Sequence, residues 1–204
     1  MQKVRQKTST QSMARKITVT AMLAAVAAVL QLLEFPVPLM PVFIKMDVSE
    51  LPALLASFSL GPLYGAAVCL VKNLIKLLTT NSGGVGELAN FAIGVFFVVP
   101  AGLIYRMRKT RGCAVAACLV GAAVMALASL PINYYVTYPV YTQFMPVEAI
   151  ISAYQAIRPG VNGLLECLII FNIPFTFIKG LIDAVLCFLI YKPLSPILHN
   201  RKRT

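Results

Sequence analysis

Four polar residues recur at helical spacing in the last apolar stretch of the chain, where they could bind a polar ligand inside a membrane. Their separations of four, three and four positions place them on one helical face: Asn172, Thr176, Lys179 and Asp183. Ionisable residues within a membrane span cost roughly 2.5–3.5 kcal/mol each, so they are candidates for function. We expect this face to point inward, where Lys179 either contacts a ligand or is neutralised by Asp183 one turn away.

Polar residues in three other apolar stretches are predicted to meet this face. They are Glu87 and Asn90 in one stretch, Lys72 and Asn73 in a second, and Asn133, Tyr134 and Tyr135, which follow Pro131, in a third. Amides, hydroxyls, a lysine and tyrosine rings together suit a planar heteroaromatic ligand with several donors and acceptors. We expect Lys76, one turn after Lys72, to extend its ammonium group outward instead.

The stretch from Phe35 to Pro52 is a polar, proline-rich break between the first two apolar segments. Prolines fix φ, lack a backbone donor and push the preceding residue toward extended geometry, which predicts an ordered extended loop. Lys45 and Asp47 follow Phe43 here, a mixture that suits a lid over a small organic ligand. The alternative is a solvated connector.

The composition indicates an integral membrane protein. Of the 204 residues, 59% are hydrophobic and 12% are charged, and the mean hydropathy of +0.81 exceeds what a soluble domain needs for its core. The net charge of +11 does not indicate nucleic-acid binding, because that would need a basic face on a soluble fold. We expect the lipid bilayer, and no nucleic acid, among the partners.

Most basic residues fall into three blocks that contain no acidic residue. By the positive-inside rule all three blocks face the cytoplasm, which predicts a multi-pass plasma-membrane protein with both termini cytoplasmic and an even number of crossings. The blocks are Lys3, Arg5, Lys7, Arg15 and Lys16, then Arg106, Arg108, Lys109 and Arg111, and finally Lys192, Arg201, Lys202 and Arg203.

The expected fold is an all-α integral membrane protein with six transmembrane helices and an ordered outer lid loop between the first two. The helices are predicted over 17–33, 49–58, 63–78, 88–105, 113–138 and 164–191, and the second is short for a full span. Residues 1–204 then form a single membrane domain. It consists of a basic cytoplasmic N-terminus (1–16), a six-helix bundle (17–191) and a basic cytoplasmic tail (192–204).

Residues for the common catalytic and metal chemistries are missing. The only histidine, His199, lies in the basic tail, which excludes an HExxH zinc site and a Ser-His-Asp triad, and there is no P-loop sequence. The five cysteines stand singly in apolar sequence and indicate neither disulfides nor a metal site. We therefore expect no enzyme and no cofactor. The alternative is a membrane-embedded transferase with Lys179 and Asp183 as acid and base.

The first helix carries small residues at spacings that let two helices approach closely: Ala21, Ala24, Ala25 and Ala28. They serve either packing within the chain or a surface for another membrane subunit.

Five motifs in order along the chain resemble the riboflavin-specific substrate-binding subunits of energy-coupling factor (ECF) transporters. They are KMDVSELPALLASFSLGP, VKNLIKLL, GGVGELANF, PINYYV and IPFTFIKG, and the resemblance covers nearly all of the chain after the first fifteen residues. It implies a six-helix protein that captures riboflavin from outside with high affinity, as a substrate and not as a cofactor. The nearest alternative is the same fold binding another vitamin.

The resemblance also implies partners. Such subunits have no ATPase and work with one membrane coupling subunit and two cytoplasmic ATP-binding-cassette ATPases, tipping over in the membrane to carry the ligand inward. Ala21 and Ala25 resemble the AxxxA docking motif for the coupling subunit.

Matching positions imply the substrate-binding residues Lys45, Asp47, Asn90, Asn133, Thr176 and Lys179. Thr176 departs from relatives that carry Asn three residues before the lysine. Since a hydroxyl offers one donor where an amide offers two, one flavin contact is absent or shifted.

Overall fold

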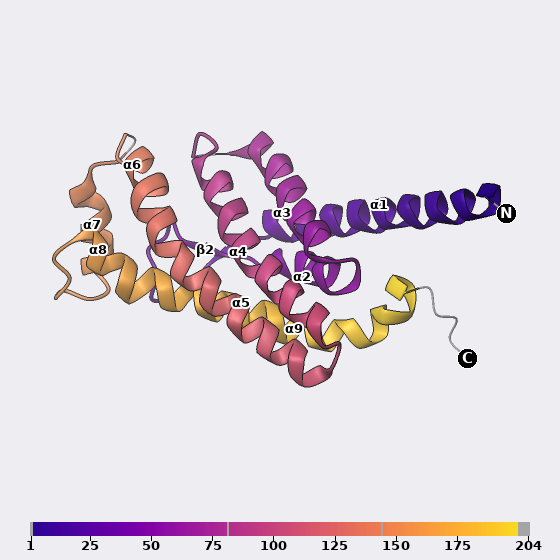
Figure 1. The fold of residues 1–204 in the computed structure, drawn as a ribbon. Coiled ribbons are helices and arrows are strands. Elements are labelled where there is room, and N and C mark those ends of the chain that lie inside the picture. Colours follow the sequence, from indigo (N-terminus) through magenta and orange to yellow (C-terminus); the bar gives the residue numbers. More distant parts are fainter. Residues whose placement is uncertain (1, 81, 144, 200–204) are drawn as a thin grey trace.

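The chain folds almost entirely into helices, which a computed structural model describes for residues 2–80, 82–143 and 145–199, with side chains from Met13 to Ile190 (Figure 1). The main helices are α1 (Gln2–Leu32), α2 (Glu50–Ser59), α3 (Pro62–Lys76), α4 (Val85–Met107), α5 (Arg111–Ile132) and α9 (Ile173–His199). Shorter ones are α6 (Tyr138–Tyr141), α7 (Val147–Gln155) and α8 (Leu164–Cys167), with one 3-10 turn, η1 (Leu77–Thr79), and two π turns, η2 (Asn133–Thr137) and η3 (Leu168–Asn172).

Five helical stretches of the described chain are long and apolar enough to cross a membrane. They are Met13–Leu32, Pro62–Thr79, Val85–Met107, Arg111–Tyr141 and Leu164–Ile190. The chain is therefore a multi-pass membrane protein. The expected six transmembrane helices are not confirmed, because the second predicted helix corresponds to α2, which is not among the five.

Helix α2 is a core helix. Its ten residues extend for about 15 Å, half of the roughly 30 Å hydrocarbon core of a bilayer. Nine of the ten are buried, and α2 packs against α1, α3, α4 and α9. Gly65 of α3 allows a close approach, since a Cβ there would lie 2.7 Å from the Cβ of Ser57. The helix therefore makes its contacts with protein on every side.

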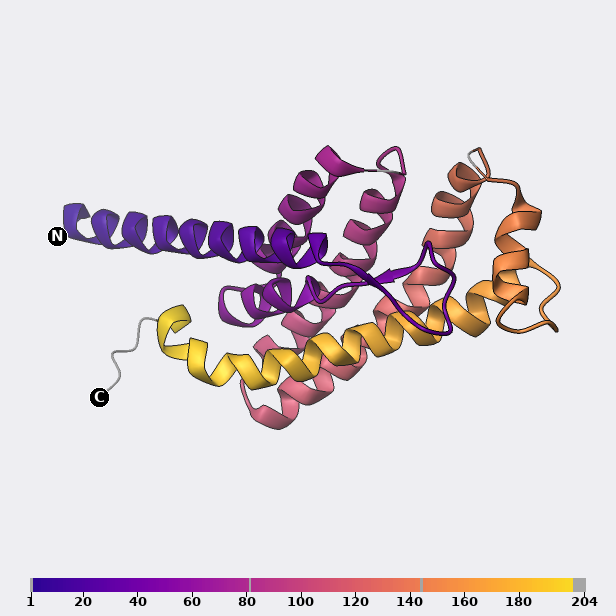
Figure 2. The same cartoon turned by 180° about the vertical axis from the view of Figure 1, so that it is seen from behind.

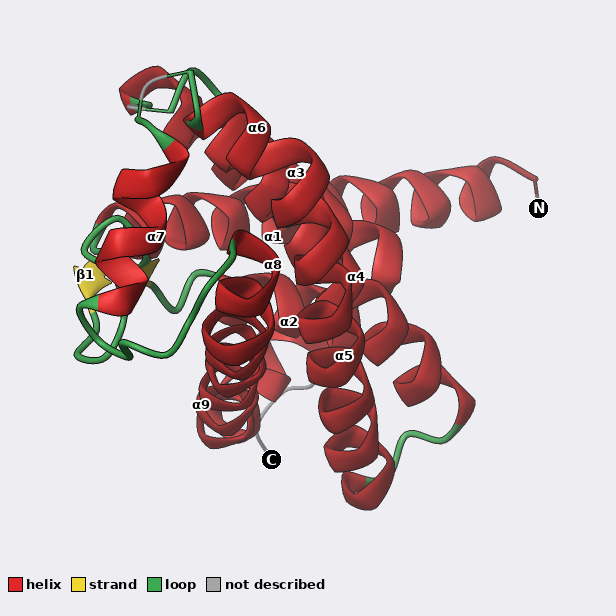
Figure 3. Cartoon of the chain, turned by 90° about the vertical axis from the view of Figure 1, so that its left-hand side faces the viewer, coloured by secondary structure: helices red, strands yellow, loops and turns green. Residues whose placement is uncertain are grey.

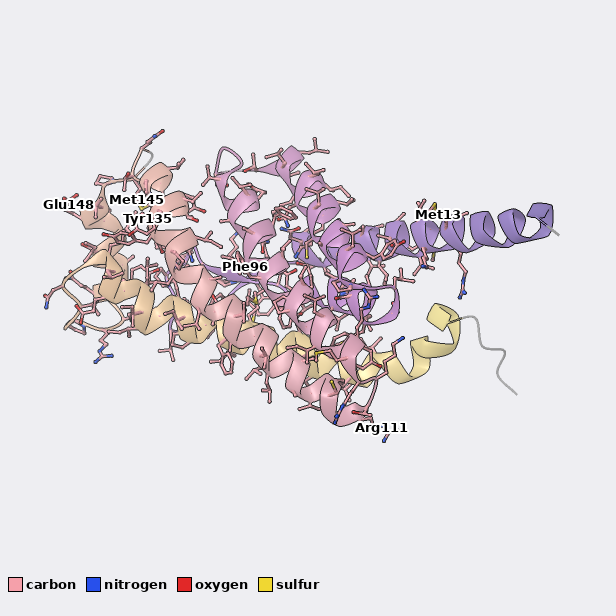
Figure 4. All side chains as sticks on the ribbon, viewed as in Figure 1. Met13, Phe96, Arg111, Tyr135, Met145 and Glu148 are labelled. Carbon is pink, nitrogen blue, oxygen red and sulfur yellow. The ribbon has the colours of Figure 1, made fainter. Side chains whose placement is uncertain are left out.

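The basic segments cluster at one end of the molecule. Met13 of α1 and Arg111 of α5 lie at the end opposite Met145 and Glu148 (Figure 4), and the start of α1 and the end of α9 lie on the same side (Figure 2). Helix α1 begins at Gln2 rather than at residue 17, because no proline or glycine interrupts the basic lead. Of the predicted tail, 192–199 continue α9 and 200–204 lie outside the described residues.

The two π turns interrupt the last two long helices, and both have a proline two residues further on. A helical proline clashes with the carbonyl four residues earlier. For Pro139 that is the carbonyl of Tyr135, in the middle of η2, and for Pro174 it is the carbonyl of Ile170, in the middle of η3. A π turn is wider than an α turn and relieves this clash while the helix continues.

The loop from α1 to α2 forms a short hairpin rather than a continuously extended segment (Figure 3, yellow strands). Strand β1 (Phe35–Pro36) pairs antiparallel with β2 (Lys45–Met46), and Leu39 between them takes a positive φ of 69°. Pro36 is compatible with this two-stranded sheet because proline has no backbone N–H and so leaves no hydrogen-bond donor without a partner. The hairpin returns the chain to the end of α1 and delivers Asp47 to the bundle interior, where it is buried.

Candidate functional site

A cavity of about 490 Å³ lies where the hairpin meets α1, α4, α9 and the segment from α5 to α6. This volume is in the range of small-molecule sites. All six residues predicted to bind substrate line it: Lys45, Asp47, Asn90, Asn133, Thr176 and Lys179. Apolar walls come from Phe43, Ile93, Met125, Ile150 and Phe175. The cavity therefore combines flat apolar surface with a few convergent polar groups.

Lys179 is fixed at the inner wall of the cavity by an ion pair with Asp47. Its Nζ lies 2.9 Å from the Asp47 carboxylate, and the two side chains are 9% and 7% exposed. The backbone N–H of Ser49 donates to the other carboxylate oxygen at 2.8 Å. The Ser49 hydroxyl donates to that same oxygen. Burial alone would raise the pKa of Asp47, but the ammonium groups of Lys179 and Lys72 and the Ser49 hydroxyl lower it well below its ordinary value. Asp47 is therefore a carboxylate, and it orients the ammonium group.

Of the two alternatives for Lys179, the direct pairing with Asp183 is not what the structure shows. The polar face of the last helix is buried as expected, and its first three members, Asn172, Thr176 and Lys179, line the cavity. Asp183 is fully buried beyond them, and neither of its carboxyl oxygens has a hydrogen-bond partner among the described residues. The lysine instead reaches a carboxylate 132 residues away in sequence.

A second buried ion pair lies next to the inner wall of the cavity, which Lys179 and Asp47 form. The Nζ of Lys72 on α3 lies 2.5 Å from the Glu50 carboxylate at the start of α2, and both side chains are 0% exposed. The same ammonium group donates to the Ser49 hydroxyl at 2.6 Å. Lys72 therefore supports the cavity wall without lining it. We call Asp47, Glu50, Lys72 and Lys179 the inner set.

A third cluster, the mouth set, consists of Glu34, Lys45 and Lys76. One carboxylate oxygen of Glu34 lies 2.9 Å from the Nζ of Lys45 and 3.2 Å from that of Lys76. The side chains are 26%, 44% and 16% exposed. Partial burial alone would raise the pKa of Glu34, but the two lysines outweigh it and the pKa is lowered. The prediction that Lys76 extends outward is wrong, since it lines the cavity and pairs with Glu34.

Tyrosines line the cavity, but not those predicted. Tyr135 is 74% exposed and does not line the cavity, while Tyr138 and Tyr141 do. The Tyr138 and Tyr154 hydroxyl oxygens are 2.6 Å apart, and Tyr154 donates to the side-chain oxygen of Asn172 at 2.8 Å. Phe43 of the hairpin meets the Tyr154 ring edge-on at a centroid distance of 6.0 Å. The hairpin is thus packed against α7.

Two further polar residues of the cavity were not predicted from the sequence, Thr137 and Gln31. The Thr137 hydroxyl and the Gln31 side-chain oxygen are buried and have no hydrogen-bond partner among the described residues. Buried polar atoms are rarely left unpaired, so both are candidates to bond a ligand. The sequence contained a signal for each residue. Thr137 lies four positions after Asn133, a spacing that places both on one helical face, and Gln31 is the one amide near the end of an apolar helix.

The alanine-rich first helix presents two different faces. Ala24 and Ala28 are buried within the bundle, whereas Ala21 and Ala25 are exposed. The structure thereby separates the two roles that the sequence left open. Ala24 and Ala28 serve internal packing, while Ala21 and Ala25 lie on a surface that this chain does not cover.

Long apolar helices around a polar, ligand-sized cavity define an integral membrane protein that binds a small molecule. The described residues contain no group of three or more His, Cys, Asp or Glu side chains placed to hold a metal ion. Residues 15–191 match the family of ECF transporter substrate-specific components, and the chain belongs to this family. It is a transport component and not an enzyme, so the transferase alternative is wrong.

Individual relatives agree with this assignment. The chain is 32% identical over 194 residues to the riboflavin transporter RibU of Staphylococcus aureus (strain TCH60), covering 95% of this chain and 97% of that one. It is 33% identical over 193 residues to the riboflavin transporter FmnP of Bacillus subtilis (strain 168), with 92% and 96% covered. A solved S component of a bacterial ECF transporter superposes with a TM-score of 0.73 at 30% identity, covering 91% of this chain and 98% of that one.

Proposed function

We propose that this chain is the high-affinity riboflavin-binding subunit of an ECF transporter. The observation that carries the proposal is the cavity, in which Lys179 and two amides, Asn90 and Asn133, converge among aromatic and aliphatic walls. A flavin ring offers flat apolar faces and a polar edge of carbonyls and ring nitrogens, which suits such a site. The names of the relatives in Staphylococcus and Bacillus support the same ligand.

The charge of the cavity also favours a neutral ligand. Its charged lining residues are three lysines and three carboxylates, so their formal charges cancel: Lys45, Lys76, Lys179, Glu34, Asp47 and Glu87. Each of the three lysines is within 3.2 Å of a carboxylate oxygen. Riboflavin is uncharged at neutral pH and leaves these pairs intact, whereas an ionised ligand would have to compete with them.

Within this proposal the six predicted residues contact the vitamin, and the hairpin acts as a lid. Lys179 donates to the polar edge of the flavin, while Asn90 and Asn133 meet its remaining donors and acceptors. Thr176, 8% exposed at the wall, offers a hydroxyl in place of an amide. The contact between Phe43 and Tyr154 closes the lid on the side of α7.

The proposed membrane orientation places the cavity outside and both termini in the cytoplasm. Arg111, the last residue of the second basic block, lies at the end opposite Met145, which lines the cavity (Figure 4), as the positive-inside rule requires for this orientation. The whole chain acts as one plasma-membrane domain. Riboflavin enters from outside and is carried inward by an ATP-driven module of one membrane coupling subunit and two ATP-binding-cassette ATPases.

The ligand is tested by titrating the detergent-purified chain into riboflavin and following quenching of flavin fluorescence, with thiamine and biotin as unlabelled competitors. We expect saturable one-to-one quenching that neither competitor reverses. Absence of quenching by a folded sample would disprove the riboflavin assignment, and thermal-shift screening would then identify which other vitamin this fold binds.

The partner is tested by substituting the exposed alanines of α1. Ala21→Leu combined with Ala25→Leu places two larger side chains where a close helix contact needs small residues. We expect riboflavin binding to persist and uptake by cells to be lost, because docking to the coupling subunit fails. Ala116→Leu, on an exposed position of α5, is the matched control. Undiminished uptake by the α1 variant would disprove this docking surface.

A further inference from the structure

We infer that Glu34 is a specificity-determining residue that makes the site favour an uncharged flavin over its phosphate monoester. This inference rests on the proposed function. Glu34 lies two residues after the end of α1, and its carboxylate bridges Lys45 of the hairpin and Lys76 of α3 at 2.9 and 3.2 Å. One acidic side chain therefore forms ion pairs with both lysines of the mouth set.

The two ends of the cavity differ in exposure, which decides where a phosphate would lie. At the inner end, Lys179 and Asp47 are 9% and 7% exposed. A phosphate monoester carries close to two negative charges at neutral pH, and burying them beside the Asp47 carboxylate would be costly. At the mouth, Lys45 is 44% exposed. The phosphate is therefore expected at the mouth, with the ring system inside.

At the mouth the phosphate would meet the Glu34 carboxylate, which already holds the two cations. It would have to displace this carboxylate from both lysines or accept a like charge beside it, and either outcome weakens binding. Glu87, which also lines the cavity, adds a second negative charge held by the hydroxyls of Thr80 and Ser82 at 2.8 and 3.0 Å. An uncharged ribityl end meets no such opposition. Glu34 therefore disfavours the phosphate in two ways. Its negative charge repels the phosphate, and it already pairs with the two lysines that would otherwise bind it.

The test measures one ratio, the Kd of riboflavin 5′-phosphate divided by the Kd of riboflavin, by fluorescence quenching on the detergent-purified full chain. We expect this ratio to exceed one for the natural sequence. Glu34→Gln frees both lysines and should lower the ratio roughly tenfold at low salt, less at high salt. The matched control is Glu148→Gln, the same charge change at an exposed site that does not line the cavity, and it should leave the ratio unchanged.

Two further variants assign the effect to the lysines. Adding Lys76→Met to Glu34→Gln should return the ratio toward its natural value, since one of the freed cations is gone. Lys45→Glu alone should raise the ratio roughly tenfold by adding a negative charge at the mouth, and it provides a test if Glu34→Gln fails to fold.

The proposal is overturned if Glu34→Gln and Glu148→Gln give the same ratio, or if the natural chain prefers the phosphate. Binding of neither ligand by the folded natural chain would instead disprove the riboflavin assignment itself. The two failures are therefore distinguishable in one series of titrations.

Discussion

The inner set and the mouth set use the same kinds of residues in opposite surroundings. In each, a lysine of α3 pairs with a carboxylate at one end of the stretch between α1 and α2. Lys72 pairs with Glu50, the first residue of α2, and Lys76 pairs with Glu34, shortly after α1. The inner pair is 0% exposed on both sides, while the mouth residues are between 16% and 44% exposed. The stretch is therefore anchored by a fixed contact inside and an adjustable one at the surface.

This difference in exposure predicts a difference in energetics. A buried pair cannot exchange its partner for water, so removing one member leaves a charge without compensation. A pair at the surface is solvated and screened, and its loss costs little. The inner set therefore determines where α2 and Lys179 lie, and the mouth set is free to respond to what enters the cavity.

The largest expected effect comes from breaking the inner pair. Lys72→Met leaves the Glu50 carboxylate buried without its cation and should destabilise the protein by about 3–5 kcal/mol. Lys45→Met at the mouth removes a pair that is half exposed and should cost less than about 1 kcal/mol. Thermal unfolding of the purified chain in detergent, followed by circular dichroism, measures both. Equal shifts for the two variants would mean that burial does not separate the two sets.

A double variant distinguishes the charge from the packing. Combining Lys72→Met with Glu50→Gln removes both charges and should recover much of the lost stability, because no unpaired ion remains. If the double variant is less stable than Lys72→Met alone, the lysine stem rather than its charge supports α2.

The next largest effect is expected at Lys179, the member of the inner set that lines the cavity. Lys179→Ala removes a charged donor and should weaken riboflavin binding roughly 10- to 100-fold, while leaving expression intact. Adding Asp47→Asn removes the carboxylate that the first change leaves unpaired, so the double variant reports the ligand contact with less structural disturbance. Fluorescence titration measures both, and natural affinity in the double variant would remove Lys179 from the ligand contacts.

The sequence predicted the helices and the polar face well because these follow from local patterns. Apolar stretches located the helices, and a 3.6-residue period placed Asn172, Thr176 and Lys179 on one buried face. The partner of Lys179 was not predicted, because helical spacing identifies only the neighbour one turn away, Asp183, which was the alternative to a ligand contact. Asp47 reaches it from a loop near the other end of the chain, and no local pattern encodes such a pairing.

Two other features of the fold were not predicted from the sequence. The core position of α2 follows from its contacts with α1, α3, α4 and α9, whereas its sequence shows only that it is short. The π turn at η2 changes which residues face inward, so Tyr138 lines the cavity while Tyr135 is exposed. The prolines that follow the π turns were a usable signal, since each is placed to clash with the middle of one.

A third prediction concerns Thr137, which shares the burial of the inner set but lacks a partner. Thr137→Val keeps the shape and removes a buried hydroxyl that is unsatisfied among the described residues, so the thermal midpoint without ligand should stay the same or rise. Riboflavin affinity should fall by roughly three- to tenfold if the hydroxyl bonds the ligand. Thr142→Val, at a position that does not line the cavity, is the control. Equal affinities for both variants would exclude Thr137 from the site.

The smallest effect on stability and affinity is expected from a change of pH. It tests whether the carboxylates of the inner set and the mouth set stay ionised. The pKa values of Asp47 and Glu34 are lowered in the folded protein. A carboxylate with a depressed folded-state pKa stabilises the protein above its ordinary pKa, 3.8 for Asp47 and 4.5 for Glu34, and this stability is lost as pH falls toward the depressed value.

Between pH 8 and pH 5.5 both carboxylates therefore stay charged, and we expect thermal midpoint and riboflavin affinity to be nearly constant. Below about pH 4 the midpoint should fall, because the unfolded chain then binds protons that the folded chain excludes. Asp47→Asn in the Lys179→Ala background should flatten this acid limb, whereas Glu34→Gln should change it only slightly because that pair is partly solvated. A sharp change in affinity between pH 5.5 and 8 that Glu34→Gln or Asp47→Asn abolishes would show that this carboxylate is protonated in the working range, and the inner and mouth sets would then differ in charge as well as in exposure.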